Sequence, residues 1–476
     1  MILHLCLSMQ NLYYKMQLYG GAHLYIYIYI HIYKLFIQKM NCKTYENGFR
    51  IVYEKTSVPS NIASLQVFCN IGSIHEPEES RGSAHFIEHM CFKGTKRLKT
   101  TKEVNQIFDE TGSESNAYTD RRYTCYYADT DKTNVKTCIS VLADMLLNSV
   151  FDKTEYMKER DVVKEEMVKD ADDYELLALE NADKQIYAGS PYQHPVDELK
   201  YHEGKHALKY ENILEIYKKF YVPANLILSV CCNLPFETIC KYVEQSYFVK
   251  VDRREPIPSI NLYVKPQSDV VYCLEKRVTN PVHICIGFRT CALSSPDKYC
   301  LKLLKTVLSG KINSRLFMLL REENGLTYSS YAYTDFFEHM GDFKMYAECD
   351  SVKVFKNGAK PGVFPLLCQM IHDLLKHGVT KEEVETAKGF IQGSQKMNAE
   401  DSSVIAKYNG KNQLFNRLAV PKYTDKYKKL IEPITLTQIN QCIRKYFCRE
   451  GMVISVISAD PPSKNQLCKF VDKIWN

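Results

Sequence analysis

The stretch AHFIEHMCF, residues 84–92, places His85 and His89 four positions apart, with Glu88 directly before the second histidine. The pattern predicts a helix that ends near Gly94. On a helix, residues i and i+4 lie on one face, one turn apart, so these two imidazoles can bind one metal ion. Glu88 lies at the edge of that face, where its carboxylate can act as a general base toward water. The alternative is a metal-free helix with two partly buried, hydrogen-bonded histidines.

HxxEH is the inverse of HExxH and is one of the zinc-peptidase signatures. A catalytic zinc needs a third protein ligand and an open position for water. The other histidines, including His202, stand in loops or ambiguous settings, and we expect them to be structural or exposed. The helical run TEYMKERDVVKEEMVKD offers carboxylates instead, namely Glu155, Glu159, Glu165 and Glu166. Helix geometry alone leaves the choice among them open.

The elements around this stretch alternate between strand and helix. Residues 48–73 predict two strands, in which Leu65, Val67, Cys69 and Ile71 share one face. Thr100 and Glu103 have capping-box spacing at the start of a second helix, which ends at Gly112. Residues 114–128 predict a strand. Two long helical patterns follow, at about 132–149 and 154–186.

The order of elements then starts again, which indicates two related halves. Residues 251–261 are charged and proline-bearing and predict a linker. VVYCLEK and VHICIGFRT then repeat the first two strands, and a helical run ends at Gly310. Aligning Gly94 with Gly310 sets Leu301, Leu304 and Lys305 opposite His85, Glu88 and His89. We expect an α+β protein with a metal-binding domain at 41–250 and a homologous domain without metal at 262–476, arranged as a clamshell.

Size and composition narrow the function classes. The 476 residues are too many for one compact core. The net charge of +6 is too small, and too evenly spread, to favour nucleic acid. The 18 cysteines are scattered without a CxxC pair, which favours reduced, buried thiols in a reducing compartment. We expect the cytoplasm, with an organelle as the alternative. Residues 1–40 contain a run, 25–30, that alternates tyrosine with isoleucine, and they predict a misannotated or disordered extension rather than a membrane span.

Three segments, in this order and spacing, resemble one family. GSAHFIEHMCFKGT, NAYTDRRYTCYY and ERDVVKEEMVKD are similar to the pitrilysin-type inverzincin zinc peptidases, and most to the beta subunit of the mitochondrial processing peptidase and its bacterial relatives. The resemblance covers about residues 42–470 and is stronger in the first half. It implies two domains, each with a mainly antiparallel sheet packed with helices. It also implies one zinc ion per chain.

The resemblance assigns roles residue by residue. It makes His85, His89 and Glu166 the zinc ligands and Glu88 the base. It makes Glu159 a residue that orients a ligand, and it places substrate binding at Asn116 and Ala117, on the edge of a strand. In the second half it matches Arg321 and Tyr328 to a pair that reaches the substrate. Asn116 could equally cap a turn, and Tyr328 could be an ordinary tyrosine.

Two positions depart from the family pattern. Arg122 stands where the family strand carries glutamate, which puts the hydrogen-bond network around the ligands in question. The glycine-rich loop has Lys311 and Ile312 after Gly310. Substrate handling is therefore expected to differ from that of the processing peptidase.

The first hypothesis is a zinc endopeptidase that cleaves short or unfolded peptide segments. The resemblance implies a homodimer, or a heterodimer with a related subunit, because family members of this size build their chamber from two chains. The second hypothesis is a non-catalytic scaffold subunit of the same fold. The third is a metal-free binding module whose histidines are coincidental.

Overall fold

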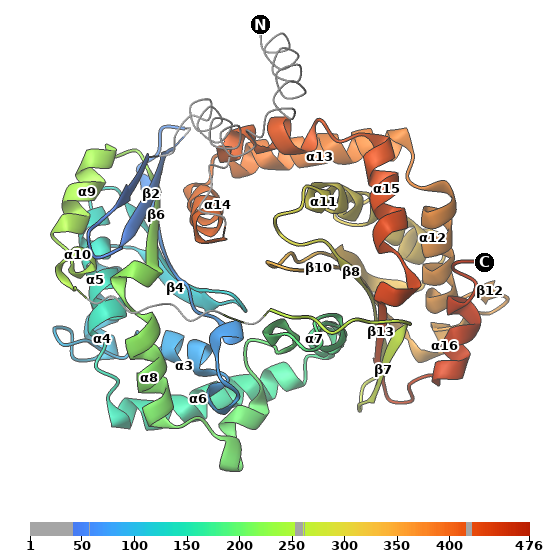
Figure 1. Cartoon of the computed structure of the whole chain (residues 1–476), viewed down its shortest axis with the longest axis horizontal. Helices are drawn as coiled ribbons and strands as arrows, with labels where there is room; N and C mark the ends of the chain where they lie inside the picture. The colour runs from blue at the N-terminus through green and yellow to red at the C-terminus, as the bar shows by residue number, and fades with distance from the viewer. Residues whose placement is uncertain (1–40, 57, 253–259, 261, 416–420) are drawn as a thin grey trace, which may run out of the picture.

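The computed structural model describes residues 41–56, 58–252, 260, 262–415 and 421–476, and Figure 1 shows the whole chain. The extension expected at 1–40 and most of the linker expected at 251–261 lie outside the described residues, and the predicted domain bounds stay predictions. Within the described part of the chain, no helix is both long and apolar enough to cross a membrane.

The first half is built on a six-stranded sheet. In spatial order its strands are β1 (Asn41–Thr44), β2 (Arg50–Lys55), β6 (Leu226–Cys232), β3 (Ile62–Cys69), β5 (Thr124–Asp131) and β4 (Glu114–Thr119). β2 runs parallel to β6, and every other neighbouring pair is antiparallel. The single strand expected at 114–128 is a hairpin, because a turn closed by Asp120 N–H donating to the Tyr123 carbonyl (2.8 Å) separates β4 from β5.

Helices cover one face of this sheet. They are α3 (Ser83–Met90), α4 (Thr101–Glu110), α5 (Val135–Asn148), α6 (Lys153–Ala171), α8 (Tyr210–Phe220), α9 (Phe236–Glu244) and α10 (Tyr247–Lys250). Leu65, Val67 and Cys69 are buried in the core that these helices form with the sheet, as the alternation predicts. The helix expected at 154–186 is two helices, because the side chain of Asp173 caps the start of α7 (Tyr174–Ile186) by accepting from Leu176 N–H (3.0 Å).

The second half is built on a five-stranded sheet. Its strands, in spatial order, are β7 (Val271–Lys276), β13 (Met452–Ser458), β8 (Pro281–Thr290), β10 (Gly341–Asp350) and β9 (Thr327–Tyr333). Its helices are α11 (Asp297–Leu308), α12 (Val363–His377), α13 (Lys381–Asn398), α14 (Ser402–Phe415), α15 (Leu436–Tyr446) and α16 (Lys464–Val471). The short strands β11 (Lys356–Asn357) and β12 (Lys360–Pro361) pair beside them.

The two halves share one topology. β7-β13-β8-β10-β9 follows the order and the strand directions of β2-β6-β3-β5-β4, with one parallel pair at the start of each series. α11 occupies the position of α3 after the second strand of the repeat, and its Leu301 and Leu304 are fully buried. The expected α+β class and the internal repeat are therefore confirmed.

One helix of each half packs against the sheet of the other half. α7 packs Ala178 and Ala182 against Cys285 of β8 and Val453 of β13. α14 lies against the first sheet, beside β2 and β6 in Figure 1. It approaches β3 so closely that a Cβ on Gly410 would lie 2.1 Å from the ring of Phe68. Both faces of the central strands are buried as a result.

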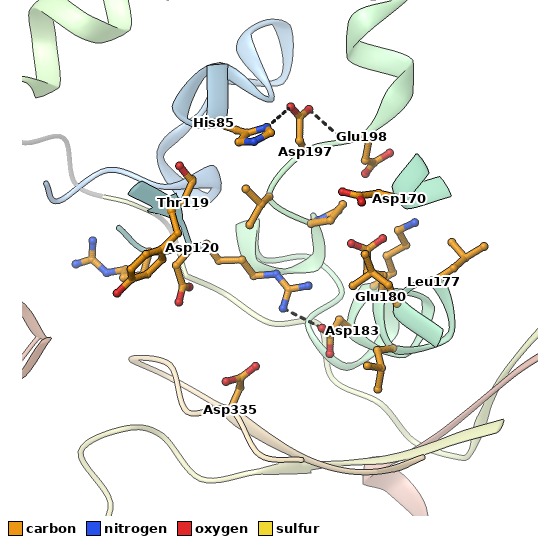
Figure 2. A pocket seen from close by; sticks show the side chains of 18 of the residues that line it. His85, Thr119, Asp120, Asp170, Leu177, Glu180, Asp183, Asp197, Glu198 and Asp335 are labelled. Atoms are coloured by element: carbon orange, nitrogen blue, oxygen red, sulfur yellow. Dashed lines mark hydrogen bonds and ion pairs between the residues drawn. The ribbon is translucent and has the colours of Figure 1, made fainter. Parts of the chain in front are cut away.

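The exchange of helices closes the halves around a shared cavity. The cavity has a volume of about 1070 Å³ and is lined from both halves, by residues that include His85, Glu88 and Glu166 on one side and Asp335 and Lys344 on the other. Figure 2 shows His85, Thr119 and Asp335 on different walls of this space. The histidine motif therefore faces an open cavity between the two halves.

Candidate metal centre

The start of α3 is fixed by two buried carboxylates. Glu76 accepts from the N–H groups of Gly82 (2.9 Å) and Ala84 (2.5 Å), which the helix itself leaves unpaired. Burial raises the pKa of Glu76 to about 8. Gly82 has φ +84°, and a Cβ there would lie 2.3 Å from Oδ1 of Asp197. Glycine at this position therefore lets the Asp197 carboxylate reach the helix.

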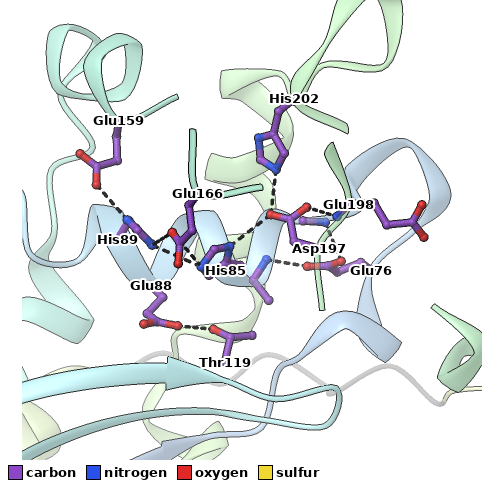
Figure 3. Close-up of polar contacts among 12 residues, drawn as sticks. Glu76, His85, Glu88, His89, Thr119, Glu159, Glu166, Asp197, Glu198 and His202 are labelled. Atoms are coloured by element: carbon purple, nitrogen blue, oxygen red, sulfur yellow. Dashed lines mark hydrogen bonds and ion pairs between the residues drawn. The ribbon is translucent and has the colours of Figure 1, made fainter. Parts of the chain in front are cut away.

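His85, His89 and Glu166 bring three donor atoms together. Nε2 of His85 and Nε2 of His89 are 3.3 Å apart, and Oε2 of Glu166 lies 3.8 Å from the first and 3.5 Å from the second. A tetrahedral zinc ion, with ligands about 2.0–2.2 Å away, spaces its donor atoms about 3.4 Å apart. The donor set and its spacing fit zinc, and α6 supplies the third donor to the pair on α3 (Figure 3).

Each histidine is held from behind by a carboxylate. Nδ1 of His89 donates to Oε1 of Glu159 (2.9 Å), and Lys93 pairs with the other oxygen of Glu159 (2.5 Å). Nδ1 of His85 donates to Oδ2 of Asp197 (3.2 Å). In the neutral imidazoles that bind a metal, a proton on each Nδ1 leaves the Nε2 lone pair facing the third donor. Glu159 thus lies directly behind His89, and its expected role in orienting a ligand stays a prediction.

The charges around these groups follow from burial and pairing. In the metal-free protein, burial alone would lower the pKa of His85, but the Asp197 carboxylate and nearby acids outweigh it and raise that pKa to about 9. Burial would raise the pKa of Glu159, but hydrogen bonds from His89 and Lys93 lower it. The pKa of Asp197 is lowered as well. Both carboxylates behind the histidines are therefore ionised.

Glu88 stands apart from the three donors. Its side chain is largely buried at the cavity wall, and Oε2 accepts from the hydroxyl of Thr119 (2.5 Å) on β4. Burial raises the pKa of Glu88, against the smaller opposing effects of Thr119 and the two histidines. One carboxylate oxygen is fixed by a neutral donor while the group borders the cavity, which is the arrangement that a proton acceptor needs.

β4 forms the open edge of the first sheet beside Glu88. Ala117 lines the cavity, and its N–H is taken by Oδ1 of the neighbouring Asn116 (2.8 Å) rather than by β5. That N–H therefore points to the free edge, where an extended peptide could pair with the strand. Asn116 is exposed on the same strand.

The structure does not place Arg321 and Tyr328 beside the three metal-binding side chains. Arg321 lies in a helical turn, Phe317–Glu322, and its Nη1 donates to the Tyr328 carbonyl (3.4 Å). The Tyr328 side chain is 90% exposed, and neither residue lines the cavity. Their expected role at the substrate stays a prediction.

Arg122 also lies away from the three donors. It donates to Oδ1 of Asn70 (2.5 Å), contacts Nε2 of His75 (2.9 Å) and pairs with Glu338 of the second half. The hydrogen-bond network behind the histidines is built without Arg122.

The second departure from the family pattern is in the glycine-rich loop after Gly310. There Ile312 is 75% exposed.

Sequence reasoning missed Asp197, whereas His202 is structural, one of the two roles expected for it. His202 is fully buried, and its Nε2 donates to the Asp197 oxygen that also holds His85 (2.8 Å). No helix or strand periodicity connects either residue with HxxEH, and both lie in an irregular segment that ends in the short turn Leu199–His202. Thr119 had no signal beyond its place at the end of an edge strand.

Comparisons with known proteins agree with this geometry. Residues 50–198 match the model of the insulinase peptidase family M16, and residues 207–389 match the M16 inactive domain. An uncharacterized zinc protease of Bacillus subtilis is 31% identical over 89% of this chain and 98% of its own length. One of Streptomyces coelicolor is 29% identical over 78% of this chain and 80% of its own. A protease from Helicobacter pylori has the same fold, with a TM-score of 0.79, 18% identity and coverage of 88% of this chain and 99% of that one.

Proposed function

The chain belongs to peptidase family M16, and from that premise we propose that it is a zinc-dependent endopeptidase acting on short or unfolded peptide segments. The observation that carries the proposal is the group of His85, His89 and Glu166, whose donor atoms all lie within 4.8 Å of one another on the wall of a cavity. Glu88 borders the same cavity and is not needed as a ligand.

The proposed cofactor is one zinc ion per chain, held by His85, His89 and Glu166. When bound, zinc lowers the pKa of a water molecule and polarises the peptide carbonyl. Glu159 and Asp197 keep the two imidazoles oriented with their Nε2 lone pairs toward it. These carboxylates also add negative charge near the ion, which strengthens the histidines as ligands.

Glu88 is proposed to accept the proton of the attacking water and to pass it to the leaving amine. Thr119 holds one of its carboxylate oxygens, so the other is free to face the water. The substrate is proposed to enter in extended form and pair with β4 through the N–H of Ala117. Backbone pairing of this kind selects for an unfolded segment rather than for one sequence.

The proposal includes a second subunit. Family members of this size enclose their substrate with two chains, so we propose a homodimer or a heterodimer with a related chain. The location proposed from the scattered cysteines is the cytoplasm. Tyr328, which is exposed in the single chain, is available to act at such an assembly.

The test compares the full chain, loaded with zinc, with its Glu88→Gln variant on a mixture of unfolded peptides. Mass spectrometry reads the cuts, and elemental analysis reads zinc per chain. Cutting that is lost in Glu88→Gln while zinc is retained supports the proposal. Glu165→Gln is the matched control, because Glu165 is an exposed neighbour of Glu166 on α6. No zinc and no cutting would favour the non-catalytic scaffold.

A further inference from the structure

Six lysines gather where α11, α14 and the segment after α14 meet. They are Lys298, Lys302 and Lys305 of α11, Lys407 and Lys411 of α14, and Lys426 between the turns Tyr423–Asp425 and Tyr427–Ile431. We call these six the lysine cluster. Among the described residues, no acidic side chain forms an ion pair with any of them. By contrast, Lys429 and Lys445 nearby are paired with Asp425 and Asp297.

Lys302 lies at the centre of the cluster. Its pKa is lowered to about 7, first by burial and then by the charges of Lys426, Lys298, Lys411 and Lys305. Burial also lowers the pKa of Lys426 and of Lys298. Like charges in a partly buried site repel each other unless an anion offsets them. No described acidic side chain forms an ion pair with these lysines, so an anion bound among them would relieve the repulsion.

The cluster meets the cavity that holds the metal-binding group at one lysine and at two aromatic rings. Lys411 lines the cavity together with Glu88. Nζ of Lys302 lies 5.7 Å from the ring centre of Phe336, and Nζ of Lys407 lies 4.4 Å from that of Tyr118. Both aromatic rings line the cavity. Aromatic faces hold ammonium groups in place without neutralising them, so the charge remains available to a ligand.

Strand β4 separates this cluster from the metal-binding group. Successive side chains of a strand point to opposite faces, so Thr119 reaches Glu88 on α3 while Tyr118 faces Lys407 on α14. A peptide paired with the edge of β4 would alternate in the same way. Every second side chain would point toward α14 and its lysines.

We propose that the lysine cluster is a binding site for carboxylates of the bound peptide, with Lys302 and Lys411 as specificity-determining residues. The proposal rests on the proposed function, because it places an extended peptide on β4. The shared chamber and the alternation along β4 favour a peptide carboxylate over a free anion such as phosphate, which would need no neighbouring edge strand. The site makes acidic side chains, spaced two apart, favourable in a substrate.

The experiment measures binding in the full chain carrying Glu88→Gln, so that peptides are bound and not cut. The probes are an unfolded peptide with glutamate at every second position and a twin with glutamine there. The strand can choose the register that points the glutamates toward α14. We expect the glutamate peptide to bind about tenfold more tightly at low salt, as charge-assisted hydrogen bonds of this kind provide. Adding Lys302→Met and Lys411→Met should bring the ratio close to one.

Lys464→Met is the matched control, because Lys464 on α16 also lies over an aromatic ring, that of Tyr272 (5.3 Å), but this ring does not line the cavity. It should leave the ratio unchanged, and circular dichroism melts show whether each variant is folded. An unchanged ratio in the folded Lys302→Met/Lys411→Met variant overturns the proposal. Equal binding of the two peptides, with inorganic phosphate bound in a lysine-dependent way, overturns it in favour of a free anion. Failure of the proposed peptidase function is seen separately: the parent would not cut the peptides, while the ratio of glutamate-peptide to glutamine-peptide binding would stay intact.

Discussion

Oδ2 of Asp197 lies between two imidazoles, 3.2 Å from Nδ1 of His85 and 2.8 Å from Nε2 of His202. The carboxylate is almost fully buried, and both hydrogen bonds lower its pKa against the effect of burial. His202 thus holds Asp197 in place, and Asp197 in turn holds His85, a predicted zinc ligand. The support of His85 comes from a segment more than a hundred residues away from HxxEH in the chain.

Replacing Asp197 should weaken zinc binding while the chain stays folded. Asp197→Asn keeps the shape of the side chain but removes the charge that orients and strengthens His85. Loss of such a partner weakens metal affinity by about 10–100-fold. Competition with a chromogenic chelator measures the affinity directly, without any assay of activity.

Asp161→Asn is the control for Asp197→Asn, because Asp161 is exposed on α6, the helix that carries Glu166. It should leave zinc affinity unchanged. Equal zinc affinity in Asp197→Asn and the parent would show that the aspartate only packs the loop.

Gly82→Ala should damage the same support from the other side. The added Cβ would lie 2.3 Å from Oδ1 of Asp197, at a backbone φ of +84°. Gly112→Ala is the matched control, since its φ of +58° is also left-handed but nothing lies within 4 Å of the new Cβ. Backbone strain of about 1 kcal/mol is common to both. We expect both variants to lose thermal stability, and only Gly82→Ala to lose zinc affinity as well. Equal losses in the two variants, both in thermal denaturation and in chelator competition, would contradict this.

Local patterns predicted the elements around HxxEH well. The i, i+4 spacing placed His85 and His89 on one helix face, and Thr100 does cap α4 by accepting from the N–H of Glu103 (3.2 Å). The alternation of Leu65 and Val67 marked the core face of β3. These features depend on residues close together in sequence, so periodicity and capping chemistry suffice to find them.

Features that depend on distant segments could not be found in this way. Helix geometry left four glutamates as candidates for the third donor, and only the family resemblance selected Glu166. The exchange of α7 and α14 leaves no local signal, because an apolar helix face does not say which sheet it covers. Asp197 and His202 owe their position to the packing of an irregular segment against α3. Tertiary contacts of this kind can be identified only once the fold is known.

The ion pair between Arg122 and Glu338 should stabilise the closed arrangement of the two halves. Both side chains are mostly buried, and Tyr192 also donates to Glu338. A double-mutant cycle with Arg122→Gln and Glu338→Gln, followed by thermal unfolding, should give a coupling of about 1–3 kcal/mol. The exposed pair of Lys158 and Glu155 (2.7 Å) is the control and should give under about 0.5 kcal/mol.

The same pair sets a pH dependence. Burial alone would raise the pKa of Glu338, but the charge of Arg122 and the hydrogen bond from Tyr192 outweigh it and lower that pKa. A carboxyl with a lowered folded pKa stabilises the protein above its unfolded pKa and loses that effect as the pH falls through the folded value. The stability gap between parent and Glu338→Gln should therefore be present at neutral pH and shrink below about pH 4. A gap that does not change between neutral and acidic pH would contradict this assignment.

Lys302 also makes stability rise with pH, but because its charged form destabilises the folded chain. Its pKa is about 7 in the folded chain, against an ordinary 10.5, because of burial and the charges of Lys298 and Lys305 on its own helix, Lys411 on α14 and Lys426. Between these two values the unfolded chain binds more protons, so this lysine makes stability rise with pH in that window, and its full penalty is present below about pH 7. Lys302→Met removes the penalty. It should raise the melting temperature by about 2 °C at neutral pH, with the gain over the parent shrinking toward pH 10. Thermal melts of both chains across this range measure the gain, and Lys464→Met should show none at any pH. A Lys302→Met variant that melts below the parent at pH 7 would mean that Lys302 already has a compensating anion in the folded chain.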